Sequence, residues 1–365
     1  MKIVSIIGAR PQFIKAALVS QALRREGYSE KSIHTGQHFD LEMSDVFFQD
    51  FNLPPPDYEL GIHSLSHGAM TGRMLEQIEA VLVKESPDIV VVYGDTDSTL
   101  AGALATVKLH IPLAHVEAGL RSFNRDMPEE HNRVLTDHCA DLLLCPTRRA
   151  VDNLRREGVG NRSETGPRRR LPQVLLVGDV MYDAVLQFAE IAEQRSSIIN
   201  ALHLRPKEYM LATVHRPCNT DSPEDLRNIV EAFLEIDEPI VFPVHPRTKC
   251  CLEKFNIAID SPKIQCIPPV GYFDMLSLEK NAKAILTDSG GMQKEAYFFR
   301  VPCITLRNET EWGETVETGW NVLAGSDHKK ILRVINNFKC DHFNPDIFGN
   351  GQAVKEVVKS FALIE

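Results

Sequence analysis

The chain has 365 residues, a formal net charge of −10, 43% hydrophobic residues and 25% charged residues. This composition is typical of a globular protein, and the length predicts two domains, because single cores rarely grow beyond ~250–300 residues. The acidic balance argues against a nucleic-acid partner, which needs a basic surface, and no apolar run approaches the ~18 residues of a membrane span.

The first ten residues, MKIVSIIGAR, predict a strand that runs into a turn rather than a secretory leader. The eight cysteines are scattered and contain no Cys-x-x-Cys pair. We therefore expect reduced thiols, most of them in the core, and a cytoplasmic protein.

Short apolar runs alternate with helical patterns along the first half of the chain. Strands are predicted at residues 2–7, 32–35, 89–93, 112–116, 142–145 and 174–177, and helices at 11–26, 41–51, 66–84 and 99–109, after Glu130 and after Thr147. The runs at 89–93 and 112–116 lack polar alternation, which is typical of parallel sheets covered by helices on both faces. The segment 160–172 is rich in Gly, Pro and Arg and predicts an exposed, mobile loop.

The second half repeats the alternation without a detectable sequence repeat. Strands are predicted at 209–214, 240–244, 263–267, 284–287 and 303–306, and helices at 182–194, 292–299 and 351–363, with another helix capped by Asp221 or Ser222. The pattern predicts an α/β protein with two Rossmann-like, doubly wound parallel-sheet domains that face each other across a cleft. We expect one domain at residues 1–179, joined by the C-terminal helix 350–365, and the other at 180–349.

Acidic residues follow the predicted strands of the first half. Asp95 comes just after strand 89–93, Glu117 lies at the carboxyl end of strand 112–116, and Glu129 and Glu130 follow within one loop. Ligands of parallel α/β sheets bind beyond the carboxyl ends of the strands. Carboxylates gathered at that edge indicate either acid–base chemistry or cation binding.

Two basic residues, Arg10 and Lys15, flank the start of the first helix, where backbone N–H groups favour an anion. A solvated basic pair is the alternative. No G-x-G-x-x-G motif follows the first strand, so a nicotinamide mechanism loses its usual support. The histidine pairs 34/38 and 63/67 lack an H-E-x-x-H pattern, which makes metal binding the minor interpretation.

Polar or aromatic residues follow every predicted strand of the second half, as a ligand site requires. They are His215 and Arg216, His245, Tyr272 and Phe273, the run Asp288-Ser289-Gly290-Gly291, and Arg307. Two glycines at a helix start expose backbone N–H groups to a phosphate, although a plain structural turn fits as well. Glu295, one turn later, is placed to accept hydrogen bonds from a ribose diol. Tyr272 and Phe273, expected in a loop, are either core anchors or, as we favour, a platform for a flat base.

Eight short motifs occur together in an order known from one enzyme family. They are G-x-R-P-x-x-I-K (8–15), T-G-Q-H (35–38), G-D-T-x-S/T-T (94–99), H-V-E-A-G-L-R (115–121), P-E-E-x-N-R (128–133), T-x-H-R (213–216), T-D-S-G-G (287–291) and L-R-x-x-T-E (306–311). The chain resembles the non-hydrolysing UDP-N-acetylglucosamine 2-epimerases over essentially its whole length. The resemblance implies a GT-B architecture, a homodimer, a UDP-sugar substrate and no metal or nicotinamide cofactor.

The resemblance also implies roles for single residues. The UDP moiety would be held by Arg10, Lys15, His215, Ser289, Gly290, Gly291 and Glu295, with Tyr272 and Phe273 at the uracil, and Arg216 and His245 complete the candidate substrate-binding set. The acid–base group would be Asp95, Glu117, Glu129 and His215. Glu129 is chosen over Glu130 because the first glutamate of P-E-E is the functional one in the family.

Several departures from the family pattern bear on the sugar. Gln12 stands where the family motif G-x-R-P-E has its Glu. The family's H-R-x-E-N reads H-R-P-C-N here, with Pro217-Cys218, and its T-E-R-P-E reads T-E-W-G-E, with Trp312-Gly313. They resemble the branch that acts on UDP-2,3-diacetamido-2,3-dideoxyglucuronate, which stays an alternative substrate. Two other functions also stay open. A GT-B glycosyltransferase would share the nucleotide site but leaves the carboxylates unexplained, and a UDP-sugar sensor would bind without turnover.

Overall fold

The computed structural model describes residues 1–37, 51, 54–160, 172–340 and 342–364. The chain divides into two compact units: unit 1 is Met1–Ala184 with Pro345–Glu365, and unit 2 is Val185–Asn344. The helix expected at 41–51 and the loop expected at 160–172 lie almost entirely outside the described residues.

Unit 1 is built on a seven-stranded parallel sheet with the order β3-β2-β1-β4-β5-β6-β7. The strands are β1 (Lys2–Ile7), β2 (Ser29–His34), β3 (Tyr58–Glu59), β4 (Ile89–Tyr93), β5 (Leu113–Val116), β6 (Leu142–Cys145) and β7 (Gln173–Leu176). In the register of the central strands, Ile6 pairs with both Ile33 and Val92. The strand order reverses between β1 and β4, which is the place where open α/β sheets bind ligands.

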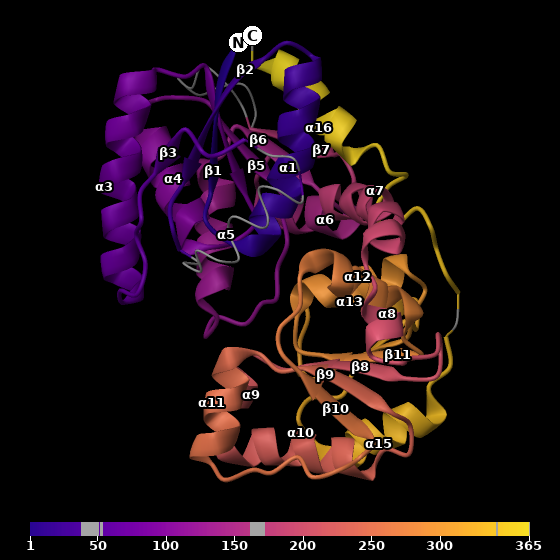
Figure 1. Ribbon diagram of the computed structural model, residues 1–365. Coiled ribbons are helices and arrows are strands. Elements are labelled where there is room, and N and C mark those ends of the chain that lie inside the picture. Colours follow the sequence, from indigo (N-terminus) through magenta and orange to yellow (C-terminus); the bar gives the residue numbers. More distant parts are fainter. Residues whose placement is uncertain (38–50, 52–53, 161–171, 341, 365) are drawn as a thin grey trace. The chain divides into compact units, whose positions relative to one another are not determined.

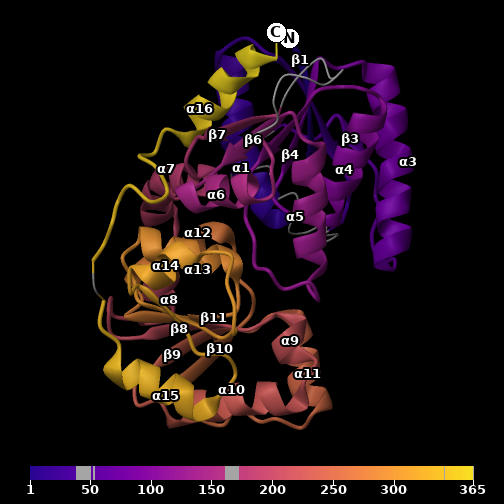
Figure 2. The same cartoon turned by 180° about the vertical axis from the view of Figure 1, so that it is seen from behind.

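Helices cover both faces of this sheet (Figures 1 and 2). On one face lie α1 (Arg10–Arg25) and α16 (Ala353–Ser360), and on the other lie α3 (His67–Glu85), α4 (Asp97–Lys108) and α5 (Pro128–Cys139). Small residues let α4 approach the sheet closely: a Cβ added at Gly102 would lie 2.8 Å from Ile6 Cδ1. The helix α6 (Arg148–Arg156) follows β6, and Thr147 caps it as predicted by accepting a hydrogen bond from the Ala150 N–H at 3.2 Å.

The core of unit 1 includes residues from both ends of the chain. Phe13 and Val19 of α1 pack with Val357 of α16 and with Phe361 of the following 3-10 turn, Phe361–Leu363. The chain termini lie near each other in Figure 1, as this packing requires. The C-terminal residues therefore complete a core whose other walls come from the N-terminal half.

Unit 2 has a six-stranded parallel sheet with the order β10-β9-β8-β11-β12-β13. The strands are β8 (Met210–Thr213), β9 (Ile240–Pro243), β10 (Ile264–Ile267), β11 (Ala284–Thr287), β12 (Cys303–Thr305) and β13 (Asn321–Leu323). The helices are α7 (Val180–Arg195, which begins in unit 1), α8 (Ile198–Ala201), α9 (Pro217–Thr220), α10 (Pro223–Glu235), α11 (Pro246–Lys254), α12 (Tyr272–Asn281), α13 (Gly290–Phe298), α14 (Gly313–Glu317) and α15 (His328–Asn337). The predicted fold class, parallel-sheet α/β with two doubly wound units, is confirmed.

The differences from the prediction are local. The edge strands β3 and β13 have two and three residues, too few for a sequence pattern to indicate. No disulfide joins the cysteines in the described residues, but Cys218, Cys250 and Cys266 are exposed, so the expectation that most thiols lie in the core was wrong. Across the described part of the chain, no helix combines the length and apolar character needed to cross a membrane.

The contribution of the C-terminal turn can be measured with two neighbouring residues. Phe361 is 0% exposed, so Phe361→Ala is expected to lower the free energy of unfolding by about 3–5 kcal/mol in denaturant titrations. Leu363, in the same turn, is 58% exposed, and Leu363→Ala is expected to change it by less than about 0.5 kcal/mol. Equal effects of the two substitutions would contradict the packing.

Candidate active site

Glu117 follows β5 in a left-handed backbone conformation, with φ 73°. This conformation is rare outside glycine and costs strain, which is typical of positions where the direction of a side chain matters. The N–H groups of Glu117 and Ala118 both donate to the Leu144 carbonyl oxygen, at 3.0 and 3.2 Å. The Glu117 carboxylate forms an ion pair with Lys15 of α1, and the two side chains are 10% and 7% exposed.

The turn after β4 lies against this ion pair. Gly94 has φ 63°, and a Cβ at this position would lie 3.4 Å from Glu117 Oε2 and 3.8 Å from Lys15 Nζ. The Gly94 carbonyl oxygen is 2.7 Å from His115 Nε2, which must therefore donate the hydrogen bond. His115 Nδ1 lies 2.7 Å from Asp137 Oδ1, and both side chains are 0% exposed. A buried pair thus fixes the backbone that leads into Asp95.

Asp95 is held from α5. Arg133 Nη2 donates to its carboxylate, and Asn132 Nδ2 donates to its carbonyl oxygen at 3.0 Å. The same amide also donates to Asp97 Oδ1 at 3.1 Å. The Asp95 side chain is 34% exposed, so its carboxylate is both fixed in direction and open on one side.

The two glutamates of P-E-E have different surroundings. Glu130 is buried and accepts hydrogen bonds from the N–H groups of Ser122 and Phe123, both at 2.9 Å, and from Arg133 at 2.6 Å. Burial alone would raise its pKa, but the hydrogen bonds and the Arg133 charge outweigh burial, so the pKa of Glu130 is lowered. Glu129 is half-buried in the first turn of α5. Glu130 therefore holds the loop, which leaves Glu129 as the better candidate for chemistry.

Gln12 joins the turn after β1 to the turn after β4. Its Oε1 accepts from the N–H groups of Gly8 at 2.7 Å and Ala9 at 3.0 Å, and its Nε2 donates to the Tyr93 carbonyl oxygen at 2.6 Å. These bonds set the start of α1, whose first residue is Arg10. The side chain of Arg10 lies outside the described part of the structure.

In unit 2, the buried carboxylate of Asp288 ties neighbouring strand ends together. It accepts hydrogen bonds from the N–H groups of His215 at 3.0 Å and Arg216 at 2.9 Å, and from Asn219 Nδ2 at 3.0 Å. Asp288 belongs to the T-D-S-G-G motif, which predicted no role for this residue. Its place directly after a predicted strand was the available signal.

His215 is held beside this carboxylate, with Nδ1 3.2 Å from Asp288 Oδ1 and its ring centre 5.7 Å from that of His245. Burial lowers the pKa of His215, and although Asp288 opposes this shift, the nearby charge of Arg216 adds to it. The imidazole is therefore neutral at neutral pH. His245 is exposed and caps α11, where Nδ1 accepts from the Arg247 N–H at 3.2 Å.

The helix α13 begins at Gly290, two residues before the predicted start, with Ser289 as its cap. A Cβ added at Gly290 would meet no atom closer than 3.7 Å, and one at Gly291 none closer than 3.9 Å, among the described residues. At Gly8, by contrast, a Cβ would lie 2.1 Å from Ser98 Oγ. Packing thus requires glycine at position 8 but not at the start of α13. There the missing side chains leave the first N–H groups open to an anion.

Tyr272 and Phe273 lie in the first turn of α12, so the expectation that they occupy a loop was wrong. Gly271 precedes the helix as its cap. Both rings are buried and pack against Phe188, at centre distances of 6.3 and 6.1 Å. The Tyr272 hydroxyl donates to Glu295 Oε1 at 3.2 Å. The aromatic pair is thus anchored in the core, and Tyr272 orients the carboxylate of Glu295.

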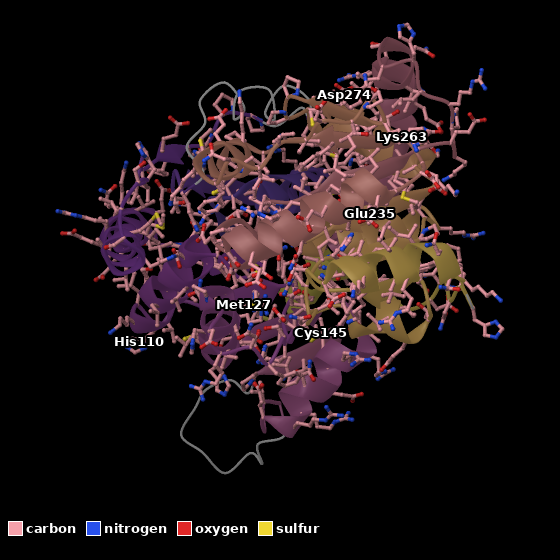
Figure 3. The ribbon with its side chains drawn as sticks, turned by 90° about the horizontal axis from the view of Figure 1, so that it is seen from below. His110, Met127, Cys145, Glu235, Lys263 and Asp274 are labelled. Carbon is pink, nitrogen blue, oxygen red and sulfur yellow. The ribbon has the colours of Figure 1, made fainter. Side chains whose placement is uncertain are left out.

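Each unit therefore gathers part of the candidate residues at the carboxyl edge of its own sheet. In unit 1 these are Lys15, Asp95, Glu117 and Glu129. Met127, at the start of α5, and Cys145, at the end of β6, mark this edge in Figure 3. In unit 2, His215, Arg216, His245, Ser289, Gly290, Gly291 and Glu295 follow β8, β9 and β11.

A family model described as UDP-N-acetylglucosamine 2-epimerase matches residues 21–362. The chain belongs to the UDP-N-acetylglucosamine 2-epimerase family. A "UDP-N-acetylglucosamine 2-epimerase homolog" of Methanococcus maripaludis is 52% identical over 365 residues, which cover 98% of this chain and 99% of the relative. Both the resemblance read from the eight motifs and the enzyme class that it implied, an isomerase of UDP-sugars, are confirmed.

Other members of the family carry different substrate names. A Pseudomonas aeruginosa protein named UDP-2,3-diacetamido-2,3-dideoxy-D-glucuronate 2-epimerase is 48% identical, with 99% of each chain covered. The crystal structure of the Methanocaldococcus jannaschii UDP-GlcNAc 2-epimerase in complex with UDP-GlcNAc and UDP has a TM-score of 0.91 and 45% identity over 100% of both chains. At the level of the fold alone, a calicheamicin glycosyltransferase is also similar, with a TM-score of 0.51 at 14% identity.

The contrast between the two adjacent glutamates of this epimerase can be tested through stability. Glu130→Gln is expected to lower the free energy of unfolding by about 1–3 kcal/mol, because a neutral amide loses the charge of the Arg133 pair and turns an NH₂ group towards backbone donors. Glu129→Gln, at the neighbouring half-buried position, is the matched control and is expected to lower it less than Glu130→Gln does.

The pH dependence gives a second check on Glu130. Because its pKa is depressed in the folded protein, its contribution is present above the ordinary value of 4.5 and is lost as the pH falls below it. Denaturant titrations between neutral and acidic pH should therefore converge for the wild type and Glu130→Gln at low pH. A constant difference would contradict the assignment.

Proposed function

We propose that this family member is a non-hydrolysing epimerase that interconverts UDP-GlcNAc and UDP-ManNAc, or a close UDP-2-acetamido sugar, for the synthesis of surface polysaccharide precursors. The observation that carries the proposal is the pair of oriented carboxylates, Asp95 and Glu117, on adjacent strand ends of unit 1. Each is paired with a cation, Arg133 and Lys15 respectively, and so is fixed in direction.

The reaction needs such groups because C2 of the sugar has no neighbouring carbonyl to acidify its proton. When the C1–O bond to UDP breaks, the electron pair of that bond leaves with UDP and the C2–H pair forms a C1=C2 double bond. A carboxylate takes the proton from one face, and an acid returns a proton to the other. UDP oxygen then attacks C1, which restores the glycosidic bond with C2 inverted, and no electrons are gained or lost overall.

Unit 2 would supply the nucleotide site. The open first turn of α13, with Ser289, Gly290 and Gly291, is suited to the diphosphate because its N–H groups and helix dipole stabilise a leaving anion. Glu295 would accept hydrogen bonds from the ribose. His215, neutral beside Asp288, would take part in proton transfer at the leaving group, with Arg216 and His245 beside it.

Unit 1 would supply the acid–base group. Asp95, Glu117 and Glu129 are the candidates at its sheet edge, and general acid–base catalysis by such groups is worth ~10²–10⁴ in rate. Arg10 would contact the diphosphate, as the family pattern implies. We also propose, from the resemblance alone, that the enzyme works as a cytoplasmic homodimer without a metal or nicotinamide cofactor.

A second candidate substrate is UDP-2,3-diacetamido-2,3-dideoxyglucuronate. It is supported by the substitutions at Gln12, Pro217-Cys218 and Trp312-Gly313. Trp312 is buried beside the start of α13, with its Nε1 3.7 Å from the Cβ position of Gly290 and the Lys294 ammonium 3.9 Å from its ring centre. An aromatic ring therefore stands where the family motif has Arg, next to the proposed diphosphate site.

The function is tested by incubating the enzyme with each candidate UDP-sugar in D₂O and following the reaction by proton NMR. We expect deuterium to enter at C2 of the epimerised sugar without added NAD or divalent metal, because the proton is exchanged with solvent between removal and return. Epimerisation with the C2 proton retained would rule out the elimination–addition route. Transfer of the sugar to an acceptor would favour a glycosyltransferase, and binding without turnover would favour a sensor.

The roles of the two oriented carboxylates are tested by Glu117→Gln and Asp95→Asn. Each is expected to lower kcat by ~10² or more, because the amide can neither remove nor return a proton. The UDP dissociation constant, measured by calorimetry, is expected to stay within several-fold of wild type. Near-normal turnover of Glu117→Gln would show the assignment to be wrong.

A further inference from the structure

Lys15 has a contact that its expected role does not explain. The family pattern assigns it, with Arg10, to the diphosphate. In the structure its ammonium is paired with the Glu117 carboxylate, a candidate acid–base group, and both residues belong to unit 1.

Both partners of this pair are anchored. Lys15 lies in the second turn of α1 on the face that packs against the sheet, and the residue is 5% exposed. Glu117 is fixed by its left-handed backbone and by the two N–H bonds to Leu144. Gly94 lies against the pair, since a Cβ there would be 3.4 Å from Glu117 Oε2, an ordinary van der Waals contact.

The energetics favour keeping this pair intact. A carboxylate buried this deeply pays a large desolvation penalty unless a cation is beside it, and removing one partner leaves the other charge uncompensated. An ammonium drawn away to a phosphate would weaken this ion pair during the step in which Glu117 must accept a proton. The same ammonium beside Glu117 favours its ionised form and directs its oxygen.

We propose that Lys15 is a positioning residue for the proton transfer, holding Glu117 ionised and aimed, and is not a ligand of the diphosphate. This inference rests on the proposed function. In the direction in which C2–H faces Glu117, the carboxylate takes the proton as the C1=C2 bond forms and UDP leaves. Lys15 then stands beside a neutral Glu117, which returns the proton in the reverse direction.

The test compares wild type with Lys15→Met, Glu117→Gln and the double variant, using kcat and the UDP dissociation constant. Lys15→Met is expected to lower kcat by ~10² while UDP binding stays within ~3-fold, because the ammonium acts through Glu117. In the Glu117→Gln background the same substitution is expected to change kcat by less than ~3-fold, since residues that act as a unit are not additive.

The pH profile of kcat/KM separates this role from simple packing. Without the ammonium, the carboxylate ionises less readily, so the acidic limb of the profile should move to higher pH in Lys15→Met. Lys15→Arg keeps the cation and should retain the position of the limb. Asp95, on the adjacent turn, keeps its ion pair with Arg133 in every variant, so the three enzymes differ only in the surroundings of Glu117.

The proposal would be overturned if Lys15→Met weakened UDP binding by ~10-fold or more, and equally in the wild-type and Glu117→Gln backgrounds. That result is the one expected of a residue that binds the phosphate directly. If Lys15→Met alone does not fold, the double variant is compared with Glu117→Gln, because the double variant lacks both charges of the pair. Equal UDP affinity of these two proteins supports the proposal, and a ~10-fold weaker affinity of the double variant overturns it. Failure of the proposed function would appear separately, as wild-type enzyme that binds UDP but incorporates no deuterium at C2.

Discussion

The buried pair of His115 and Asp137 is the contact on which the geometry of unit 1 depends. His115 Nε2 holds the Gly94 carbonyl oxygen, and Asp137 accepts hydrogen bonds from the Gly119 N–H at 3.1 Å and from Arg121 at 2.7 Å. Burial alone would raise the pKa of Asp137, but the hydrogen bond and charge of His115, together with Arg121, lower it. One ionised carboxylate thereby fixes the turns that follow β4 and β5. The strained backbone of Glu117 is tolerated because this network over-determines the loop.

In unit 2, the buried carboxylate of Asp288 holds the turns at the strand ends, as Asp137 does in unit 1. Asp288 directly follows β11 and accepts hydrogen bonds from N–H groups of the turn after β8. It also accepts a hydrogen bond from Asn219 Nδ2, which donates as well to the Leu306 carbonyl oxygen at 2.9 Å. In both units a buried acid connects neighbouring strand ends, so that side chains from separate loops are fixed before any ligand arrives. Such pre-organisation is what electrostatic stabilisation of a leaving group requires.

The sequence predicted the elements whose signal is local. The strands β4 and β6 are uninterrupted apolar runs, and Thr147 and Ser222 cap helices where their position before the helical pattern indicated. The candidate site was harder to predict. Asp137 had no local signal, because its partners lie 16–22 residues away, and Glu130 differs from Glu129 only through contacts with a loop that folds back onto it. Tyr272 was placed in a loop because the prolines and glycine before it concealed the helix that begins at that residue.

The docking of α16 on α1 has a consequence for synthesis on the ribosome. Unit 2 is one continuous stretch, Val185–Asn344, whereas unit 1 needs the residues from Pro345 onwards. The core between sheet and helices stays open on the side of Val357 and Phe361 until these two residues have left the exit tunnel. Although its residues are made first, unit 1 therefore finishes folding after unit 2, and an incomplete chain exposes apolar surface that chaperones recognise.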